Sequence, residues 1–228
     1  MFTEIYKKLF KSYGPQGWWP LLDHKGINPT KTGAINGYHP RQYDFPQTEQ
    51  QRFEICVGAI LTQNTSWIQV EKALQNLAAV TSITSSDLKS LDEETMKNAI
   101  KPAGYFNQKT KKLLLFIEFY ESLHGRTPTR DELLAVWGIG RETADSILLY
   151  AFNIPTFVVD AYTRRIFSAT GLIDKNADYN DIQKIFEDVL LKDVAVYQEF
   201  HALIVEHAKR YCKTKPDCEQ CILRTYCH

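Results

Sequence analysis

The residues from Leu133 to Arg165 read LLAVWGIGRETADSILLYAFNIPTFVVDAYTRR, and the organisation expected for the rest of the chain follows from them. Apolar residues recur at helical spacing on both sides of Gly138-Ile139-Gly140, which predicts two helices joined by a short glycine turn. Glycines accept positive φ angles and leave backbone amides uncovered, so an anion can approach the start of the second helix. An extended run then leads to Asp160, which opens a further helix.

The glycine turn has two interpretations, and by itself it is a helix C-cap of a kind found in many helical proteins. Its flanking residues favour another interpretation. They resemble the helix-hairpin-helix and catalytic-aspartate signature of the endonuclease III family of DNA glycosylases, and the matching pattern is L-x-x-x-G-I-G-R-x-T-A-x-x-I followed by V-V-D-A-Y-x-x-R. The resemblance implies that hairpin amides bind a DNA phosphate, with a monovalent cation at the hairpin. The hairpin residues expected at the DNA are Gly138, Ile139, Gly140, Arg141 and Thr143.

Composition limits the function classes. Among 228 residues, 27 Lys and Arg balance 27 Asp and Glu, so the formal net charge is zero and argues against a purely electrostatic DNA binder. No apolar run approaches the ~20 residues that span a membrane. The first residues, Met1 to Glu4, lack the features of a signal peptide. We therefore expect a cytoplasmic, nucleoid-associated protein of a bacterium or archaeon, with no membrane contact and a monomeric state.

The chain as a whole predicts an all-α fold, because apolar residues recur at three-four spacing and no long alternating pattern occurs. The resemblance implies two domains. Residues 46–154 would form a six-helix domain with the hairpin at about 130–151. Residues 1–45 and 155–228 would form a domain of terminal helices with the catalytic Asp160 and a four-cysteine loop at 212–228. Residues 21–50 read as a long surface loop near a site.

Four of the five cysteines crowd the end of the chain, at Cys212, Cys218, Cys221 and Cys227. In a reducing compartment such crowding favours a metal over disulfides. Zinc and a [4Fe-4S] cluster both accept four thiolates, and the spacing leaves both open. The resemblance favours a structural [4Fe-4S] cluster, because endonuclease III relatives carry a C-terminal loop of nearly the same pattern. The first gap is one residue shorter than in the enzyme that names the family.

Asp160 also has two interpretations, since most aspartates at helix starts are N-caps without further function. Beside the hairpin signature, the resemblance makes it the catalytic carboxylate, which stabilises an oxocarbenium-like transition state and activates water. Glu142 stands where endonuclease III has a lysine that forms a Schiff base. A glutamate cannot do this, so the resemblance is to a monofunctional glycosylase and AP lyase activity is not expected.

Three tryptophans and one glutamine are the candidate contacts of an extruded nucleotide: Trp18, Trp19, Trp67 and Gln63. A base that carries a positive charge after alkylation gains ~1–2 kcal/mol between indole rings and is a good leaving group. W-W-P, G-A-I-L-T-Q-N-T, F-N-Q-K and G-I-G-R-E-T-A-D together resemble the 3-methyladenine DNA glycosylases of the endonuclease III-like branch. That resemblance implies that the protein flips an alkylated purine out of double-stranded DNA, hydrolyses its N-glycosidic bond, and fills the gap with Gln63.

Lys109 stands with two further lysines at a predicted helix start, where cations oppose the helix dipole. This indicates either a phosphate contact, which we expect, or a solvated face. Two other functions remain open. A mismatched-thymine or oxidised-pyrimidine glycosylase would use the same scaffold, with the tryptophans as packing. A non-catalytic helix-hairpin-helix module would bind DNA with Asp160 as a cap only. The identity of the released base, and whether any base is released, separates them.

Overall fold

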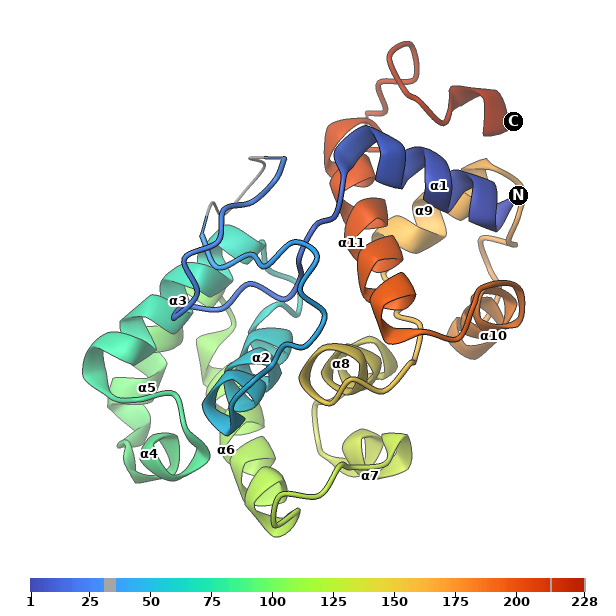
Figure 1. Ribbon diagram of the computed structural model, residues 1–228. Coiled ribbons are helices and arrows are strands. Elements are labelled where there is room, and N and C mark those ends of the chain that lie inside the picture. Colours follow the sequence, from blue (N-terminus) through green and yellow to red (C-terminus); the bar gives the residue numbers. More distant parts are fainter. Residues whose placement is uncertain (31–35, 214, 228) are drawn as a thin grey trace.

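The computed structural model describes residues 1–30, 36–213 and 215–227, and within them the fold is all-α as predicted (Figure 1). A single bridge between Ile27 and Asn36 is the only extended pairing recorded in this part of the chain. Residues 31–35 of the expected surface loop, and 214 and 228 of the expected cysteine loop, lie outside the described residues. The helices are α1 (Phe2–Tyr13), α2 (Glu49–Leu61), α3 (Trp67–Val80), α4 (Ser85–Ser90), α5 (Glu93–Ile100), η1 (Lys101–Ala103), α6 (Phe106–Ser122), α7 (Arg130–Ala135), α8 (Arg141–Ser146), η2 (Ile147–Ala151), α9 (Ala161–Ala169), α10 (Tyr179–Val189), α11 (Val194–Arg210) and η3 (Arg224–Tyr226).

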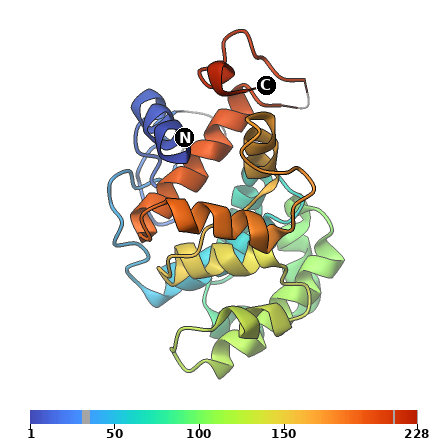
Figure 2. The same cartoon turned by 90° about the vertical axis from the view of Figure 1, so that its right-hand side faces the viewer.

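The helices form two groups that differ in their place along the chain (Figure 1). The first group runs from α2 to η2, and the second combines α1 with α9, α10 and α11. Because α1 packs along α11, the N-terminus and the cysteine-rich tail lie at the same end of the molecule (Figures 1 and 2). The chain passes from one group to the other through residues 152–160, which have no regular structure and end at Asp160.

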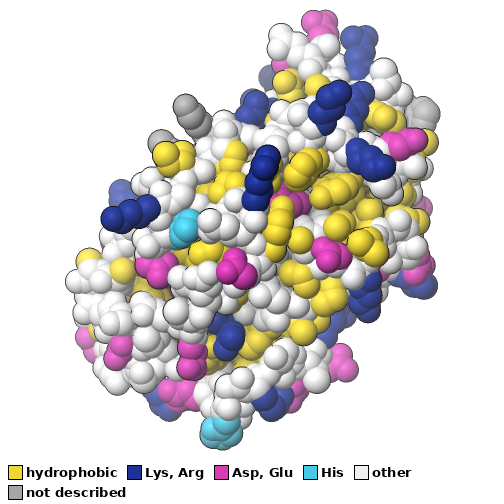
Figure 3. Space-filling model, viewed as in Figure 1, with side chains coloured by type: hydrophobic (Ala, Val, Ile, Leu, Met, Phe, Trp, Pro, Cys, Tyr) yellow, Lys and Arg dark blue, Asp and Glu magenta, His cyan; other side chains and the backbone are white. Residues whose placement is uncertain are grey.

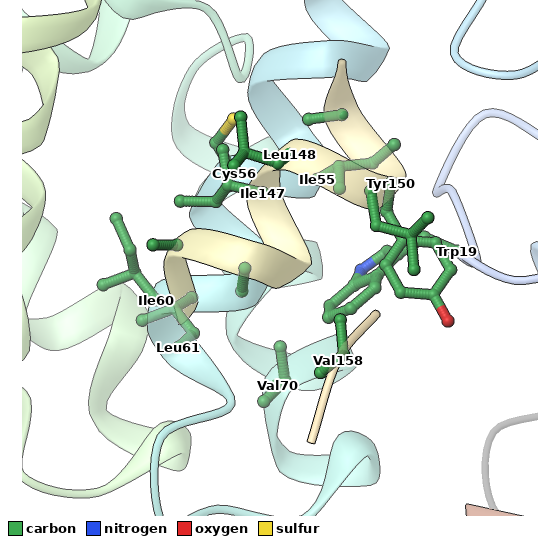
Figure 4. Close-up of a cluster of buried hydrophobic side chains, with 14 of the residues drawn as sticks. Trp19, Ile55, Cys56, Ile60, Leu61, Val70, Ile147, Leu148, Tyr150 and Val158 are labelled. Atoms are coloured by element: carbon green, nitrogen blue, oxygen red, sulfur yellow. The ribbon is translucent and has the colours of Figure 1, made fainter. Parts of the chain in front are cut away.

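Helix α2 is the centre of the first group, because it is apolar on nearly every side and buried along most of its length. Thr48 caps it by accepting a hydrogen bond from the Gln51 amide. Its side chains Ile55 and Ile60 pack with Ile147 of η2, and the ring of Trp19 covers the end of this cluster (Figure 4). Helix η2 therefore continues α8 directly into the core, which fixes the second arm of the hairpin.

An aromatic cluster holds the second group together. Phe2 of α1 stacks on Phe167 of α9 at 5.2 Å between ring centroids and meets Phe186 of α10 edge-on at 4.8 Å. Phe200 of α11 completes the cluster, 5.9 Å from Phe167. Aromatic pairs in such geometry add to the burial of their area. The start of α9, and with it Asp160, is thus held against α11.

Candidate active site

Asp160 is the N-cap of α9 and is 8 % exposed. Its Oδ1 accepts hydrogen bonds from the Thr163 amide at 2.6 Å and from the Thr163 hydroxyl at 2.8 Å. Its Oδ2 faces His201 Nε2 of α11 at 3.6 Å. One carboxylate oxygen is therefore used by the helix start, and the other points to a neighbouring helix and keeps accepting capacity.

The surroundings of Asp160 favour its ionised form. Burial alone raises the pKa of this carboxyl, but the polar group of His201 that faces it and the two Thr163 donors outweigh burial, so the pKa lies below its ordinary value. A carboxylate held ionised in a buried place interacts strongly with a positive charge brought near it. The site is thus suited to stabilising a developing cation.

Two further titratable groups act on Asp160. Glu142 lies in the first turn of α8, where part of its side chain reaches solvent and its carboxyl is crowded by surrounding protein. Desolvation of the carboxyl and the charge of Asp160 raise its pKa to about 7, although the charges of His201 and Arg164 lower it. Lys209 of α11 is half-buried, and burial lowers its pKa although Glu206 and Asp160 oppose the shift. An acid and an amine therefore both interact with the charge of the carboxylate.

The three tryptophans do not form one wall. Trp18 is half-buried beside the Asp160 cluster, with its ring 5.7 Å from the His201 ring and 5.8 Å from Lys209 Nζ. Trp19 is buried in the core and lies edge-on to Trp67 at 5.3 Å. Trp67 lines a separate cavity of about 380 Å³ with Leu22, Glu54, Glu71 and Leu74 among its other walls. Of the three, only Trp18 has a recorded ring contact with His201, the residue that faces Asp160.

The hairpin is joined to the end of α2 through Gln63. Its side-chain amide donates to the Gly138 carbonyl and to the Thr143 hydroxyl, each at 3.0 Å. Lys112 of α6 in turn donates to the Gln63 side-chain oxygen. Gly138 has a φ of 87°, which favours glycine, and Ile139 is buried between the two glycines. Gln63, predicted to fill a gap in DNA, is therefore in contact with the hairpin itself.

The remaining hairpin residues differ in exposure. Thr143 is buried, whereas Arg141 is exposed and pairs with Asp178 at 2.5 Å. Trp137, just before the turn, is 51 % exposed and has Lys111 Nζ 4.6 Å from its ring centroid. On the face drawn in Figure 3, acidic and basic side chains are scattered and do not form one basic patch. Close approach of DNA therefore depends on local groups, as the zero net charge suggests.

The expected phosphate contact of Lys109 is wrong. Its side chain is 2 % exposed, and Nζ donates to the Leu61 carbonyl at 2.8 Å, the Thr65 hydroxyl at 2.9 Å and the Ala103 carbonyl at 2.8 Å. An ammonium has three protons, so these acceptors use all of them. Burial, and then the charge of Lys112, lower the pKa of Lys109 to about 8. This lysine closes the corner between α2 and α3.

The four tail cysteines are neighbours. Burial raises the pKa of the Cys212 thiol, and the other three thiols raise it further, although the charge of Arg165 lowers it. Cys221 Sγ lies 3.3 Å from His207 Nε2. Within residues 1–30, 36–213 and 215–227, no three metal-ligating side chains come close enough together to coordinate one ion. The thiols supply the right donor chemistry for iron or zinc.

Sequence reasoning missed three residues around Asp160: Tyr150, His201 and Lys209. Their signal was the run of buried polar residues in α11, an otherwise apolar helix, because polar groups buried in a core need partners.

None of the helices in the described part of the chain is both long enough and apolar enough to cross a membrane.

Comparison with known proteins supplies the family context. Residues 57–192 match the model of the HhH-GPD superfamily of base excision DNA repair proteins. A Methanocaldococcus jannaschii protein, provisionally named a DNA repair glycosylase, is 40 % identical over 238 residues, which cover 100 % of this chain and 96 % of the relative. An endonuclease III of Sulfolobus acidocaldarius is 31 % identical and covers 77 % of this chain and 81 % of its own length.

Solved structures show the same fold. A trapped endonuclease III–DNA covalent intermediate aligns with a TM-score of 0.77 at 18 % identity, covering 100 % of this chain and 96 % of that one. A Helicobacter pylori 3-methyladenine DNA glycosylase bound to 1,N6-ethenoadenine aligns with a TM-score of 0.67 at 26 % identity, covering 92 % and 97 %. A thermostable thymine-DNA glycosylase aligns with a TM-score of 0.71 at 18 % identity, covering 99 % and 94 %.

Proposed function

The chain belongs to the HhH-GPD superfamily of base excision DNA repair proteins, and we propose that it acts in double-stranded DNA as a monofunctional glycosylase on an alkylated purine. The observation that carries this proposal is Asp160, a buried carboxylate kept ionised, with one oxygen committed to a helix cap and the other facing His201, whose ring meets the ring of Trp18.

The reaction follows from this placement. The damaged nucleotide leaves the stack, and its base lies against Trp18 while its sugar faces Asp160 Oδ2. The bond between C1′ and the base nitrogen breaks, the electron pair leaves with the base, and positive charge builds on the sugar. The carboxylate stabilises that charge. A water oxygen then bonds to C1′ and its proton passes to Asp160, which leaves an abasic site.

An alkylated purine suits this machinery because it leaves without strong acid assistance. Alkylation at a ring nitrogen gives the base a positive charge, so the departing base becomes neutral when it takes the bonding electrons. An indole face attracts such a cation. The Helicobacter pylori relative, which is named a 3-methyladenine DNA glycosylase, supports this choice at 26 % identity.

Strand cleavage is not part of the proposal. Glu142 occupies the position expected for a Schiff-base lysine, and a carboxyl cannot form an imine with the sugar. We expect no covalent product when the protein is mixed with substrate DNA and borohydride, and no nicked strand without alkaline treatment.

A second candidate is removal of a neutral base, either mismatched thymine or an oxidised pyrimidine. One observation favours it: Lys209 Nζ lies 5.8 Å from the Trp18 ring centroid, where it would repel a cationic base and donate to a carbonyl. Glu142, whose pKa burial raises to about 7, would supply the proton that a neutral leaving base needs.

We further propose that the four tail thiolates hold a [4Fe-4S] cluster, with zinc as the alternative. Cys212 directly follows Tyr211, the C-cap of α11, and Cys218, Cys221 and Cys227 come later in the tail, so a shared ion would pin the tail to the end of α11. Bound there, the group supplies a structural crosslink and no step of the reaction.

The test is base release by wild-type protein and Asp160→Asn. Methylated duplex, a T·G mismatch duplex and an oxidised-pyrimidine duplex are incubated under single-turnover conditions, and the released base is identified by chromatography. Wild type should release a methylated purine, and Asp160→Asn should lose at least about 100-fold in rate while it binds DNA normally. Asparagine also caps helices, so the fold is kept.

The matched control is Asp92→Asn, which changes the N-cap of α5 in the same way, far from Asp160 along the chain. Its rate should equal that of wild type. Equal rates for wild type and Asp160→Asn would overturn the catalytic role. Release of thymine or an oxidised pyrimidine in place of a methylated purine would establish the second candidate, and release of nothing would leave a DNA-binding module.

A further inference from the structure

A row of three buried polar side chains ends at Asp160. His201 of α11 places Nε2 3.6 Å from Asp160 Oδ2, and its Nδ1 lies 2.7 Å from the Tyr150 hydroxyl of η2. The same hydroxyl lies 3.2 Å from the Gln198 carbonyl. The three side chains come from α9, α11 and η2, so the row spans the boundary between the two helix groups.

The hydrogen-bonding capacity of these groups determines where the proton of His201 lies. If the Tyr150 hydroxyl donates to Nδ1, a neutral imidazole carries its proton on Nε2, which faces Asp160. If the hydroxyl donates to the Gln198 carbonyl instead, Nδ1 must donate to the tyrosine oxygen. A bare Nε2 would then face a carboxylate, which is unfavourable because two acceptors would meet without a proton between them. The favoured arrangement therefore has Nε2 presenting a proton to Asp160.

The surroundings keep this arrangement in place. Trp18 meets the His201 ring at 90° and 5.7 Å between centroids, which covers one side of it. Burial, with the charges of Glu199 and Asp160, raises the pKa of Tyr150 well above its ordinary value, so its hydroxyl remains protonated. The row therefore consists of a permanent donor, an imidazole and a carboxylate in fixed order.

We propose that His201, aligned by Tyr150, is the positioning residue that holds Asp160 ionised and turned toward the sugar. This inference rests on the proposed glycosylase function. Oδ1 is fixed by Thr163, so a donor on the Oδ2 side sets the rotation of the carboxyl plane. The 3.6 Å separation leaves Oδ2 free to accept a water or contact the sugar as well.

Other charges face the same row and are part of its pH dependence. They come from α8, α9 and α11, and they are Glu142, Arg164, Glu199 and Lys209. Because none of them is altered in the variants below, any shift between variants reports the change made at His201 or Tyr150.

The first experiment is the pH dependence of single-turnover base release for wild type, His201→Leu and His201→Gln, on the duplex that wild type processes fastest. Wild type loses rate as the pH falls and Asp160 takes up a proton. Without the His201 donor the carboxylate is less stable, so the acid limb of His201→Leu should shift upward by about one pH unit. Glutamine can offer an N–H near the place of Nε2, so His201→Gln should recover part of the shift.

Tyrosine variants give a matched comparison on neighbouring helices. Tyr150→Phe removes the hydroxyl that aligns His201 and should slow base release about fivefold. Tyr197→Phe removes a buried hydroxyl that has no hydrogen-bond partner among the described residues, and it should leave the rate unchanged. Equal losses in the two variants would assign both effects to packing and overturn the positioning role.

A measurement without catalysis separates this inference from the proposed function. The carboxyl carbon of Asp160, followed by NMR through a pH titration in wild type and His201→Leu, should titrate at higher pH in the variant. Superimposable titrations would overturn the inference even in an active enzyme. A protein that releases no base yet shows the shift would refute the proposed function and retain the Asp160–His201 coupling.

Discussion

Glu54 of α2 shows how a buried carboxyl behaves when its surroundings differ from those of Asp160. It is buried at the wall of the cavity beside Trp67 and accepts one recorded hydrogen bond, from the Leu22 amide at 2.8 Å. Burial raises its pKa to about 7, the Leu22 amide opposes the rise, and Asp23 adds to it. Asp160, with Thr163 and His201 as donors, shifts the other way. The number of hydrogen-bond donors around each carboxyl, and not how deeply it is buried, therefore decides which of the two is charged.

This pKa has a consequence for stability. The folded state holds the Glu54 proton more tightly than the unfolded state, so stability falls as the pH rises from about 4.5 to about 7. Glu54→Gln removes the titration and still accepts from Leu22. We expect it to be more stable than wild type by about 1–3 kcal/mol at pH 8, and similar to wild type near pH 4.5, by urea unfolding.

The control for this prediction is Glu118→Gln, a substitution at an exposed position of α6. It should leave the difference between pH 8 and pH 4.5 as in wild type. A Glu54→Gln protein whose stability changes equally at both pH values would show that packing, and not titration, governs this site.

At the scale of elements, the two glycines of the hairpin have different tasks. Gly138 has a φ of 87°, and a Cβ there would meet Lys112 Cγ at 2.6 Å. Lys112 in turn holds Gln63 against the turn. Gly140 has a φ of −91°, which any residue adopts, and a Cβ there would enter open space. No internal contact requires a glycine at this position. The missing side chain instead leaves room for a group that approaches the turn from outside the protein.

Alanine at each glycine separates folding from DNA binding. Gly138→Ala should lose about 1–2 kcal/mol of stability, because the left-handed conformation is strained with a Cβ and Lys112 must move. Gly140→Ala should keep its melting temperature but bind duplex DNA with an abasic-site analogue several-fold more weakly in fluorescence anisotropy. Normal DNA binding by Gly140→Ala would exclude a close approach of phosphate at this turn.

At the scale of the whole molecule, the tail is held to the body by Leu223, which is buried in the core, and by a few polar contacts. Arg165 of α9 donates to the Cys212 carbonyl at 2.7 Å, and Lys8 of α1 lies 5.1 Å from the Tyr226 ring centroid. Exposed cation–π contacts contribute only about 0.5–1 kcal/mol. A metal shared by the tail thiols would add a crosslink between this segment and the second helix group.

Protein purified from iron-supplied cells should be brown, with about four irons per chain, and Cys218→Ser should lose both the colour and thermal stability. Cys56→Ala is the matched control, since Cys56 lies in the core of the first group and should keep the iron. A colourless protein with one zinc per chain would show that the site binds zinc and not an iron-sulfur cluster. A protein with neither metal would refute the metal site.

Residues of the hairpin and the caps were predictable because their physics is local. The turn at Gly138, the cap at Asp160 and the all-α pattern all depend on backbone preferences and apolar spacing within a few neighbouring residues. The boundaries of the two domains and the roles of the site residues stay predictions that the experiments above address.

The sequence by itself thus determined the helices, the glycine turn and the carboxylate at the start of α9. The tertiary structure alone decided what faces that carboxylate. Tyr150 and His201 are 51 positions apart, and no periodicity in either helix says that they meet. Likewise the sequence around Lys109 is typical of a surface position, and it is the packing of α6 against the end of α2 that buries this lysine. Side-chain environment depends on how distant segments pack, because burial and donors come from other elements.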